Sequence, residues 1–184
     1  MGKVREVWPV KILVGLLSRD VELFETVKLE LENEWGPVDR QSDLMEFFFT
    51  RYYEEELGSD LKRLFMSFAG LADPGRLPEM KLFTNYIEDK LSVDGRRRVN
   101  IDPGYITPAR LILVTTKDNA HRVYLGRGIY GDLTLIYSHS QGSFNPLPWT
   151  YPDYRSEEYI AYFKCVREMC RKQLRNSVPI IFKR

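Results

Sequence analysis

Polar side chains that could bind a ligand or transfer a proton gather in one central stretch of the chain. The sequences NIDPGYI and KDNAHR contribute Asn100, Asp102, Tyr105, Lys117, His121 and Arg122. Three of these groups can carry positive charge, and an arginine can bind a phosphate or carboxylate through two parallel hydrogen bonds. Residues 100–105 and 117–122 are therefore predicted to form a polar site for an anionic small molecule.

Two residues of this stretch, His121 and Asp102, are the candidate catalytic residues. In a catalytic version His121 is the general base, while Lys117 and Arg122 stabilise anionic charge. Asp102 is expected to pair with His121 or Arg122, because a buried polar group without a partner costs stability. The alternative is a purely structural network, in which the histidine only satisfies its neighbours.

A helical segment could add ligand-binding side chains to the same site. Lys81, Asn85 and Glu88 are spaced so that they share one face of a helix. That face either borders the end of the NIDPGY strand or is simply solvated. The sequence TRYYEEELG could bring an acidic cluster to the same rim, where it would hold a divalent cation or remain in water.

Several established site motifs are absent from the chain. It has no GxxxxGK[ST] phosphate loop, no CxxC pair, no HExxH and no GxSxG. His121 and His139 are the only histidines, so a zinc site would need carboxylates or both thiols. The sequence therefore predicts no metal site and identifies no cofactor.

Composition restricts the class of partner. Hydrophobic residues make up 43% of the 184 residues and charged residues 29%, as in folded proteins. The net charge of +1 provides no overall attraction to nucleic acid. No apolar run approaches the ~20 residues of a membrane span, and the N-terminus lacks a signal-peptide pattern. We therefore expect a cytoplasmic protein that does not bind membranes.

The thiols are predicted to be unpaired and to contribute to packing. Cys165 and Cys170 are five residues apart on a predicted helix, which separates them by roughly 140° around its axis. Such side chains do not face each other.

Apolar patterns predict the elements that would carry the site. Strands are expected at Val10–Ser18, 43–53, 61–71 (where a short helix also fits) and 96–101, and helices at 23–35 and 77–91. Asp102-Pro103-Gly104 has turn chemistry, so the fourth strand is expected to end there. Residues 109–116 fit either a strand or a helix.

The C-terminal part is predicted to contain a hairpin, a loop and a helix. Residues 121–137 form the hairpin, 146–154 a loop rich in proline and aromatic residues, and a helix begins at Ser156. The tail 176–184 either adds an edge strand or stays loose.

The order strand, helix, strand, strand, helix, strand predicts an α+β fold. It is the order of a ferredoxin-like split βαβ core, here extended by the C-terminal hairpin and helix. Neither repeats nor a linker interrupt the chain, so residues 1–184 are predicted to be one domain, with helices mainly on one face.

The chain resembles a family of bacterial and archaeal proteins, the domain of unknown function 4416. The resemblance includes GPVDRQSDLMEFFFTRYYEEELG, KLFTNYIE, RRVNIDPGYI, TTKDNAHRVYLGRGIYGDLTLIY and LPWTYPDY, in order along nearly the whole chain. Members are sometimes labelled GTP-binding proteins, a label that no motif of this chain supports. The resemblance implies no established activity.

Three hypotheses of function follow, in decreasing order of support. The first is a site for an anionic, nucleotide-type or other small molecule, whether or not it catalyses a reaction. The second is an interaction module whose aromatic loop 146–154 meets a partner, such as a second copy of the chain in a homodimer. The third is RNA binding, which the near-neutral net charge disfavours. It would use flanking tyrosines for base stacking and the basic residues Arg96, Arg97, Arg98, Lys117 and Arg122.

Overall fold

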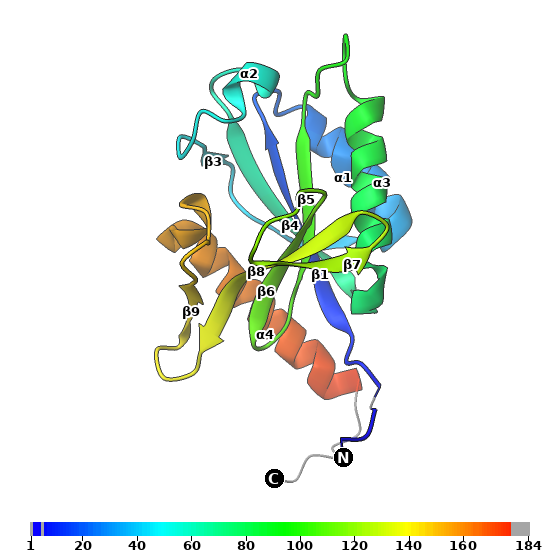
Figure 1. The fold of residues 1–184 in the computed structure, drawn as a ribbon, viewed down its shortest axis with the longest axis vertical. Coiled ribbons are helices and arrows are strands. Elements are labelled where there is room, and N and C mark those ends of the chain that lie inside the picture. Colours follow the sequence, from blue (N-terminus) through cyan, green and yellow to red (C-terminus); the bar gives the residue numbers. More distant parts are fainter. Residues whose placement is uncertain (1, 5, 178–184) are drawn as a thin grey trace.

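The chain folds around one nine-stranded antiparallel sheet (Figure 1). The computed structural model describes residues 2–4 and 6–177. The strand order is β2-β4-β1-β5-β6-β8-β7, with β3 paired to β4 and β9 to β8. The strands are β1 (Val10–Ser18), β2 (Val38–Gln41), β3 (Met45–Glu46), β4 (Lys62–Ala72), β5 (Asn100–Ile106), β6 (Arg110–Thr115), β7 (Arg122–Gly126), β8 (Ile129–Ser138) and β9 (Ser143–Pro146).

Helices cover both faces of this sheet. Helices α1 (Leu23–Trp35) and α3 (Leu77–Lys90) lie on one side, and α4 (Glu157–Ser177) lies on the other (Figure 1). The apolar stripes predicted for these helices are confirmed, since each of them is buried against the sheet. The expectation of helices mainly on one face is correct for α1 and α3 and wrong for α4, because the sheet is apolar on both sides.

Strand β1 is the centre of the fold, as its continuous apolar run predicts. Every residue of β1 is buried, and it pairs with β4 on one side and β5 on the other. Val14 and Leu16 pack toward α1 and α3, whereas Leu13 packs toward α4. A strand buried on both faces shows no polar alternation, so the prediction for Val10–Ser18 is confirmed.

Two helices, α1 and α3, each connect a pair of parallel strands in this part of the sheet. Because all neighbouring strands are antiparallel, β1 and β2 run parallel with β4 between them. Likewise α3 connects the parallel strands β4 and β5, which β1 separates. The α+β class is thus observed, with a large antiparallel sheet.

The predicted strand at 43–53 is wrong for most of its length. Only Met45–Glu46 pairs with β4, and a loop and the short helix α2 (Glu54–Leu57) follow. Phe47 and Leu57 instead pack with Leu17 over the end of β1. The aromatic residues here cover the sheet rather than extend it.

The other ambiguous segments become strands. Residues 61–71 correspond to β4 and 109–116 to β6, while 121–137 form the predicted hairpin of β7 and β8. The tail beyond Ser177 lies outside the described residues.

The predicted turn at Asp102-Pro103-Gly104 is a second correction, because these residues lie inside β5. Gly104 pairs with Leu113 of β6, but no residue of β5 before Gly104 pairs with β6. The backbone groups of Ile101, Pro103 and Tyr105 point away from β1, given the alternation along a strand. Pro103 has no N–H to donate there. Proline therefore separates β5 from β6 within the sheet instead of ending the strand.

The prediction for the cysteines is correct in one part. Neither thiol forms a disulfide, and Cys170 is buried against the sheet. Cys165 is exposed, so its expected packing role is wrong. Among residues 2–4 and 6–177, no helix combines the length and hydrophobicity needed to cross a membrane.

Replacing Gly104 by alanine is expected to destabilise the fold by about 1–3 kcal/mol, the usual range for a forced steric insertion. A Cβ atom at this position would lie 2.4 Å from the backbone oxygen of Ile112, so β5 and β6 would have to separate at their closest approach. Urea unfolding would measure the change. The control is Gly70→Ala, because a Cβ at Gly70 meets no atom within 4 Å; equal losses for both variants would contradict this reason.

Candidate ligand-binding site

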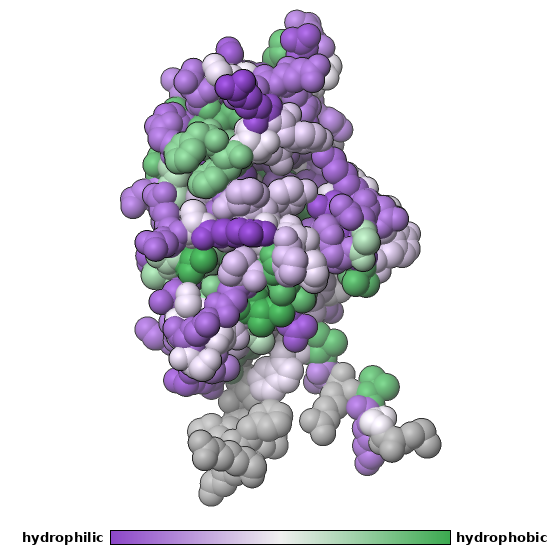
Figure 2. Space-filling view, turned by 60° about the vertical axis from the view of Figure 1, so that its left-hand side comes forward, coloured by the Kyte–Doolittle hydropathy of each residue, from purple (hydrophilic) through white to green (hydrophobic). Residues whose placement is uncertain are grey.

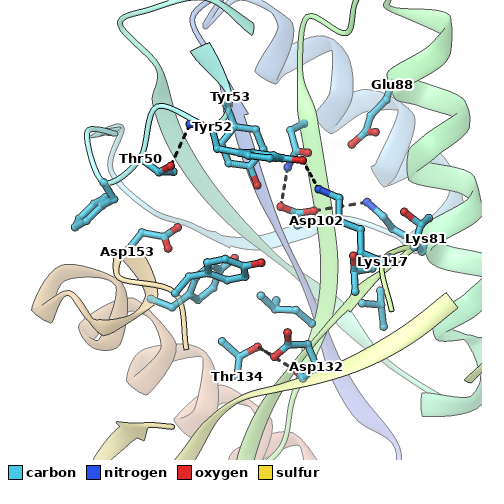
Figure 3. A pocket seen from close by; sticks show the side chains of 18 of the residues that line it. Thr50, Tyr52, Tyr53, Lys81, Glu88, Asp102, Lys117, Asp132, Thr134 and Asp153 are labelled. Carbon is cyan, nitrogen blue, oxygen red and sulfur yellow. Dashed lines mark hydrogen bonds and ion pairs between the residues drawn. The ribbon is translucent and has the colours of Figure 1, made fainter. Parts of the chain in front are cut away.

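A cavity of about 770 Å³ opens where β5 and β6 separate. We call it the β5–β6 cavity. Strand β5, the end of β6, α3, the segment 47–53 and the segment 151–154 line it. Ligand sites in proteins commonly have this volume and this mixture of apolar and polar walls. Figure 3 shows side chains of β5, α3, segment 47–53 and segment 151–154 around it, among them Asp102, Lys81, Tyr53 and Asp153.

Helix α3 supplies the hydrogen bonds that β6 cannot supply to β5. Lys81 Nζ donates to the Ile101 backbone oxygen at 2.9 Å, and the Ile101 N–H donates to the Glu88 carboxylate. Both side chains are almost fully buried. A sheet edge inside the protein needs such partners, so these two residues keep the gap open without leaving polar backbone groups unpaired.

Asp102 lies at the centre of the β5–β6 cavity (Figure 3). The Asn100 amide donates to Asp102 Oδ2 at 2.6 Å, and Lys81 Nζ is 3.6 Å from Asp102 Oδ1. Arg97 in turn donates to the Asn100 side-chain oxygen and to Glu88. This network fixes the orientation of the Asp102 carboxylate.

The expected pairing of Asp102 with His121 or Arg122 is wrong, because both residues contact another carboxylate, that of Asp132. Arg122 Nε donates to Asp132 Oδ2 at 3.0 Å, and His121 Nε2 lies 3.2 Å from the same oxygen. The His121 ring stacks on Trp149 with centroids 5.4 Å apart. Strand pairing is the reason, since Arg122 of β7 is the register partner of Asp132 in β8.

Lys117 and Tyr52 meet at the rim, from two loops on different sides of the cavity (Figure 3). Lys117 Nζ donates to the Tyr52 hydroxyl at 2.5 Å and lies 4.5 Å from the centre of its ring. Both side chains are exposed to solvent. No carboxylate lies within ion-pair distance of this ammonium group in the described part of the chain.

The structure brings six of the eight predicted site residues to one cavity. The lining includes Lys81, Asn85, Asn100, Asp102, Lys117 and Arg122. His121 lies behind Asp132 and does not line it. Tyr105 packs against the core on the α1 and α3 side, because it alternates with Asp102 and Gly104 along β5. Burial raises the pKa of the Tyr105 hydroxyl.

Other lining residues escaped the sequence reasoning. Asp132, Thr134, Asp153 and Tyr154 belong to segments that were interpreted as a hairpin and as a partner-binding loop. The signal for Asp132 was a lone charge in the apolar run GDLTLIY. Asp153 carried no comparable signal, since a charge in a polar loop is ordinary.

The acidic groups of TRYYEEELG do not form a cation site. Glu56 accepts two hydrogen bonds of 2.6 Å from Arg97, and these lower the pKa of Glu56. Across residues 2–4 and 6–177, no group of three or more histidine, cysteine or acidic side chains is arranged to hold a metal ion.

Comparison with known proteins places the chain in a family. The model of the family described as "Domain of unknown function (DUF4416)" matches residues 8–169. The chain belongs to the DUF4416 family. No curated protein and no solved structure matches it. The matched residues include every segment that lines the cavity of this DUF4416 protein.

Burial shifts the proton affinity of several groups in the cavity wall. It raises the pKa of Glu88, with Lys81 partly opposing the shift. It also raises the pKa of Asp153, which Arg63 partly opposes. The pKa of the Tyr53 hydroxyl rises because of burial and of the nearby Asp102 charge. Glu88 and Asp153 therefore take up a proton more readily than exposed carboxyl groups do.

Glu88→Gln is expected to make the protein less sensitive to pH. Because folding raises the pKa of Glu88, the folded state retains a proton that the unfolded chain has already lost, so ionisation of Glu88 lowers stability as pH rises. We therefore compare the free energy of unfolding of the wild type with that of the variant. The wild-type value minus the variant value should decrease as the pH is raised from about 4, near the ordinary glutamate pKa, to neutral pH.

Urea unfolding at several pH values would measure this difference. Glu79→Gln on the same helix removes an exposed carboxylate and controls for the loss of one negative charge. A difference between wild type and Glu88→Gln that stays constant with pH would contradict the role of burial.

Proposed function

We propose that this protein binds a small organic anion in the β5–β6 cavity. The observation that carries the proposal is the pairing of charges around it. Four of the five lining carboxylates already contact a cation, in the pairs Glu88–Arg97, Asp102–Lys81, Asp132–Arg122 and Asp153–Arg63. The fifth, Asp89, is exposed on α3. Lys117, at the rim, contacts a tyrosine instead. The cation left to meet a ligand is therefore Lys117, and the ligand group that suits it is negative.

The remaining walls indicate the uncharged part of the ligand. Aromatic side chains from two segments line the cavity, namely Phe47, Phe49, Tyr52, Tyr53, Tyr151 and Tyr154. Aromatic rings favour stacked or edge-on contacts with other rings. A nucleotide-type molecule combines a planar ring with an anionic group and is the class we favour. In a catalytic version, Asp102 is the carboxylate placed to accept a proton from it.

The interaction-module alternative has less support from the contacts of the aromatic loop. The Trp149 indole N–H donates to the Leu133 backbone oxygen, and residues 151–154 line the cavity. The Trp149 hydrogen bond and the cavity contacts of residues 151–154 are both made within this molecule and not with a partner. Phe48 is the most exposed ring of segment 47–53, at 79%. Figure 2 shows several separate groups of hydrophobic side chains among hydrophilic ones on one face of the molecule.

The RNA-binding alternative is weakened by the pairing of its arginines. Arg97 contacts Glu56 and Glu88, and Arg98 contacts Asp20. These cations are already neutralised, so they do not form a free basic stripe for phosphates.

We also propose that β2, β4, β1 and β5 with α1 and α3 constitute a ferredoxin-like core. The support is the arrangement of the two helical crossovers. Strand β4 lies between β1 and β2, which α1 connects, and β1 lies between β4 and β5, which α3 connects. The β5–β6 cavity would then lie at one edge of this core, where the additional strands join.

A thermal-shift screen with nucleotides and phosphorylated metabolites is the first test, and Lys117→Ala is its key variant. A ligand at about 100 times its dissociation constant adds about 2.7 kcal/mol of stability, so a wild-type shift is measurable. Loss of the Lys117 contact should weaken binding about tenfold, equivalent to about 1.4 kcal/mol. Lys172→Ala, which removes an exposed lysine of α4 outside the cavity lining, should leave binding unchanged.

Asp102→Asn distinguishes a binding site from a structural network. If the carboxylate meets the ligand, the variant loses the ligand-induced shift, in addition to the stability lost when the buried Lys81 is left without its counter-charge. A lower melting temperature with an intact ligand response would instead assign Asp102 to structure alone. Isothermal titration calorimetry would report the affinity directly.

A further inference from the structure

A second group of polar atoms lies buried behind one wall of the β5–β6 cavity. Among the residues that the structure describes, Arg63 Nε and Nη1, the Tyr154 hydroxyl and the Tyr159 hydroxyl have no hydrogen-bond partner. Their residues are 2%, 3% and 1% exposed, respectively. Buried polar atoms nearly always have a partner in a native protein, so four unpartnered atoms on three neighbouring side chains require an explanation.

These side chains come from three elements that meet at one place. Arg63 belongs to β4, Tyr154 to the 3₁₀ turn Asp153–Arg155 and Tyr159 to α4. The rings of Tyr154 and Tyr159 are 5.8 Å apart, and both make edge contacts with Phe65. Burial raises the pKa of the Tyr159 hydroxyl to about 12, and the charge of Arg63 together with a polar contact from its side chain partly opposes this rise. The two groups nevertheless form no hydrogen bond of ordinary geometry.

The absence of a side chain at Gly15 makes room for the guanidinium group. A Cβ atom at Gly15 would lie 2.9 Å from the Phe65 ring atom Cε1 and 3.2 Å from Arg63 Nη1, so the glycine makes room for both side chains. Gly15 is also the register partner of Asp102 in β5. Arg63 therefore extends from β4 across β1 toward the side of the sheet where the cavity lies.

The guanidinium group directly contacts residues of the cavity wall. Arg63 Nη2 donates to Asp153 Oδ2 at 3.3 Å, and the Arg63 carbon Cζ lies 5.2 Å from the centre of the Phe47 ring. Asp153, Phe47 and Tyr154 all line the cavity. The unpartnered atoms of Arg63 thus lie next to the wall that Asp153 forms. Figure 3 shows Asp153 on the opposite side of the cavity from Lys81 and Glu88 of α3.

We propose that Arg63, Tyr154 and Tyr159 form a subsite for an oxyanion, a phosphate or carboxylate group of the ligand bound in the β5–β6 cavity. This inference rests on the proposed function. Guanidinium N–H and phenol O–H groups are donors, and an oxyanion provides several acceptor lone pairs for them at once. The raised pKa of Asp153 allows its carboxyl group to be neutralised when a second anion approaches Arg63.

The alternative is a structural arginine that is held by Asp153 and by the rings of Phe47 and Phe65. The two interpretations differ in what the tyrosine hydroxyls do. As ligand donors they are unsatisfied without an anion, so their removal costs no stability in its absence. As structural donors to buried water, their removal lowers stability in every buffer.

The test is thermal unfolding of the full chain in inorganic phosphate, in acetate and in chloride at matched ionic strength. The variants are Tyr154→Phe and Tyr159→Phe, each of which removes one oxygen atom. We expect phosphate or acetate to raise the melting temperature of the wild type above its value in chloride. Both variants should lose most of that rise and melt in chloride at least as high as the wild type.

Tyr162→Phe is the matched control on α4. The Tyr162 hydroxyl donates to the Arg40 backbone oxygen at 3.2 Å, so this variant should melt lower in every buffer and keep the anion-dependent rise. A larger rise in phosphate than in acetate identifies a phosphate group, and the reverse identifies a carboxylate.

Two outcomes would overturn the subsite. One is a wild type that responds equally to phosphate, acetate and chloride, and the other is an anion response that survives in both phenylalanine variants. If an organic ligand then still depends on Lys117, the cavity proposal stands and only the subsite fails. A ligand that depends on the tyrosine hydroxyls but not on Lys117 would reverse that conclusion.

Discussion

The separation of β5 from β6 is the constraint on which the rest of the structure depends. Pro103 cannot donate a hydrogen bond toward β6, while Gly104 allows the two strands to approach closely one residue later. A sheet that is continuous on one side of Gly104 is therefore open on the other. The side chains of α3 occupy the edge of this opening, where Lys81 and Glu88 bind the backbone of Ile101.

The opening explains why charged groups are buried around the β5–β6 cavity. A backbone edge inside a fold needs polar partners, and the partners used here are charged, so each requires a counter-charge. Lys81 meets Asp102, and Glu88 meets Arg97. The cavity wall thereby acquires fixed, oriented charges before any ligand is present. Preorganised groups of this kind lose little entropy on binding.

The arrangement also connects the two layers of the protein. Lys81 and Glu88 belong to the helical layer of α1 and α3, whereas Asp153 and Tyr154 precede α4 on the opposite face. The cavity lies between these layers because the sheet is interrupted there. A ligand in it would contact both layers at once, and its binding would stabilise their packing against each other.

The sequence by itself determined the elements whose burial is uniform or strictly periodic. Val10–Ser18 is an uninterrupted apolar run, and the stripe of α4 recurs at helical spacing, so hydrophobic burial alone fixes them. It also identified six lining residues, four from the polar stretches 100–105 and 117–122 and two, Lys81 and Asn85, from their shared helix face. Only the tertiary structure decided that Asp132 rather than Asp102 contacts Arg122, and that Arg63 lies over Gly15. Those contacts depend on strand register and on the missing pairing at Pro103, which are properties of distant segments brought together and not of local sequence.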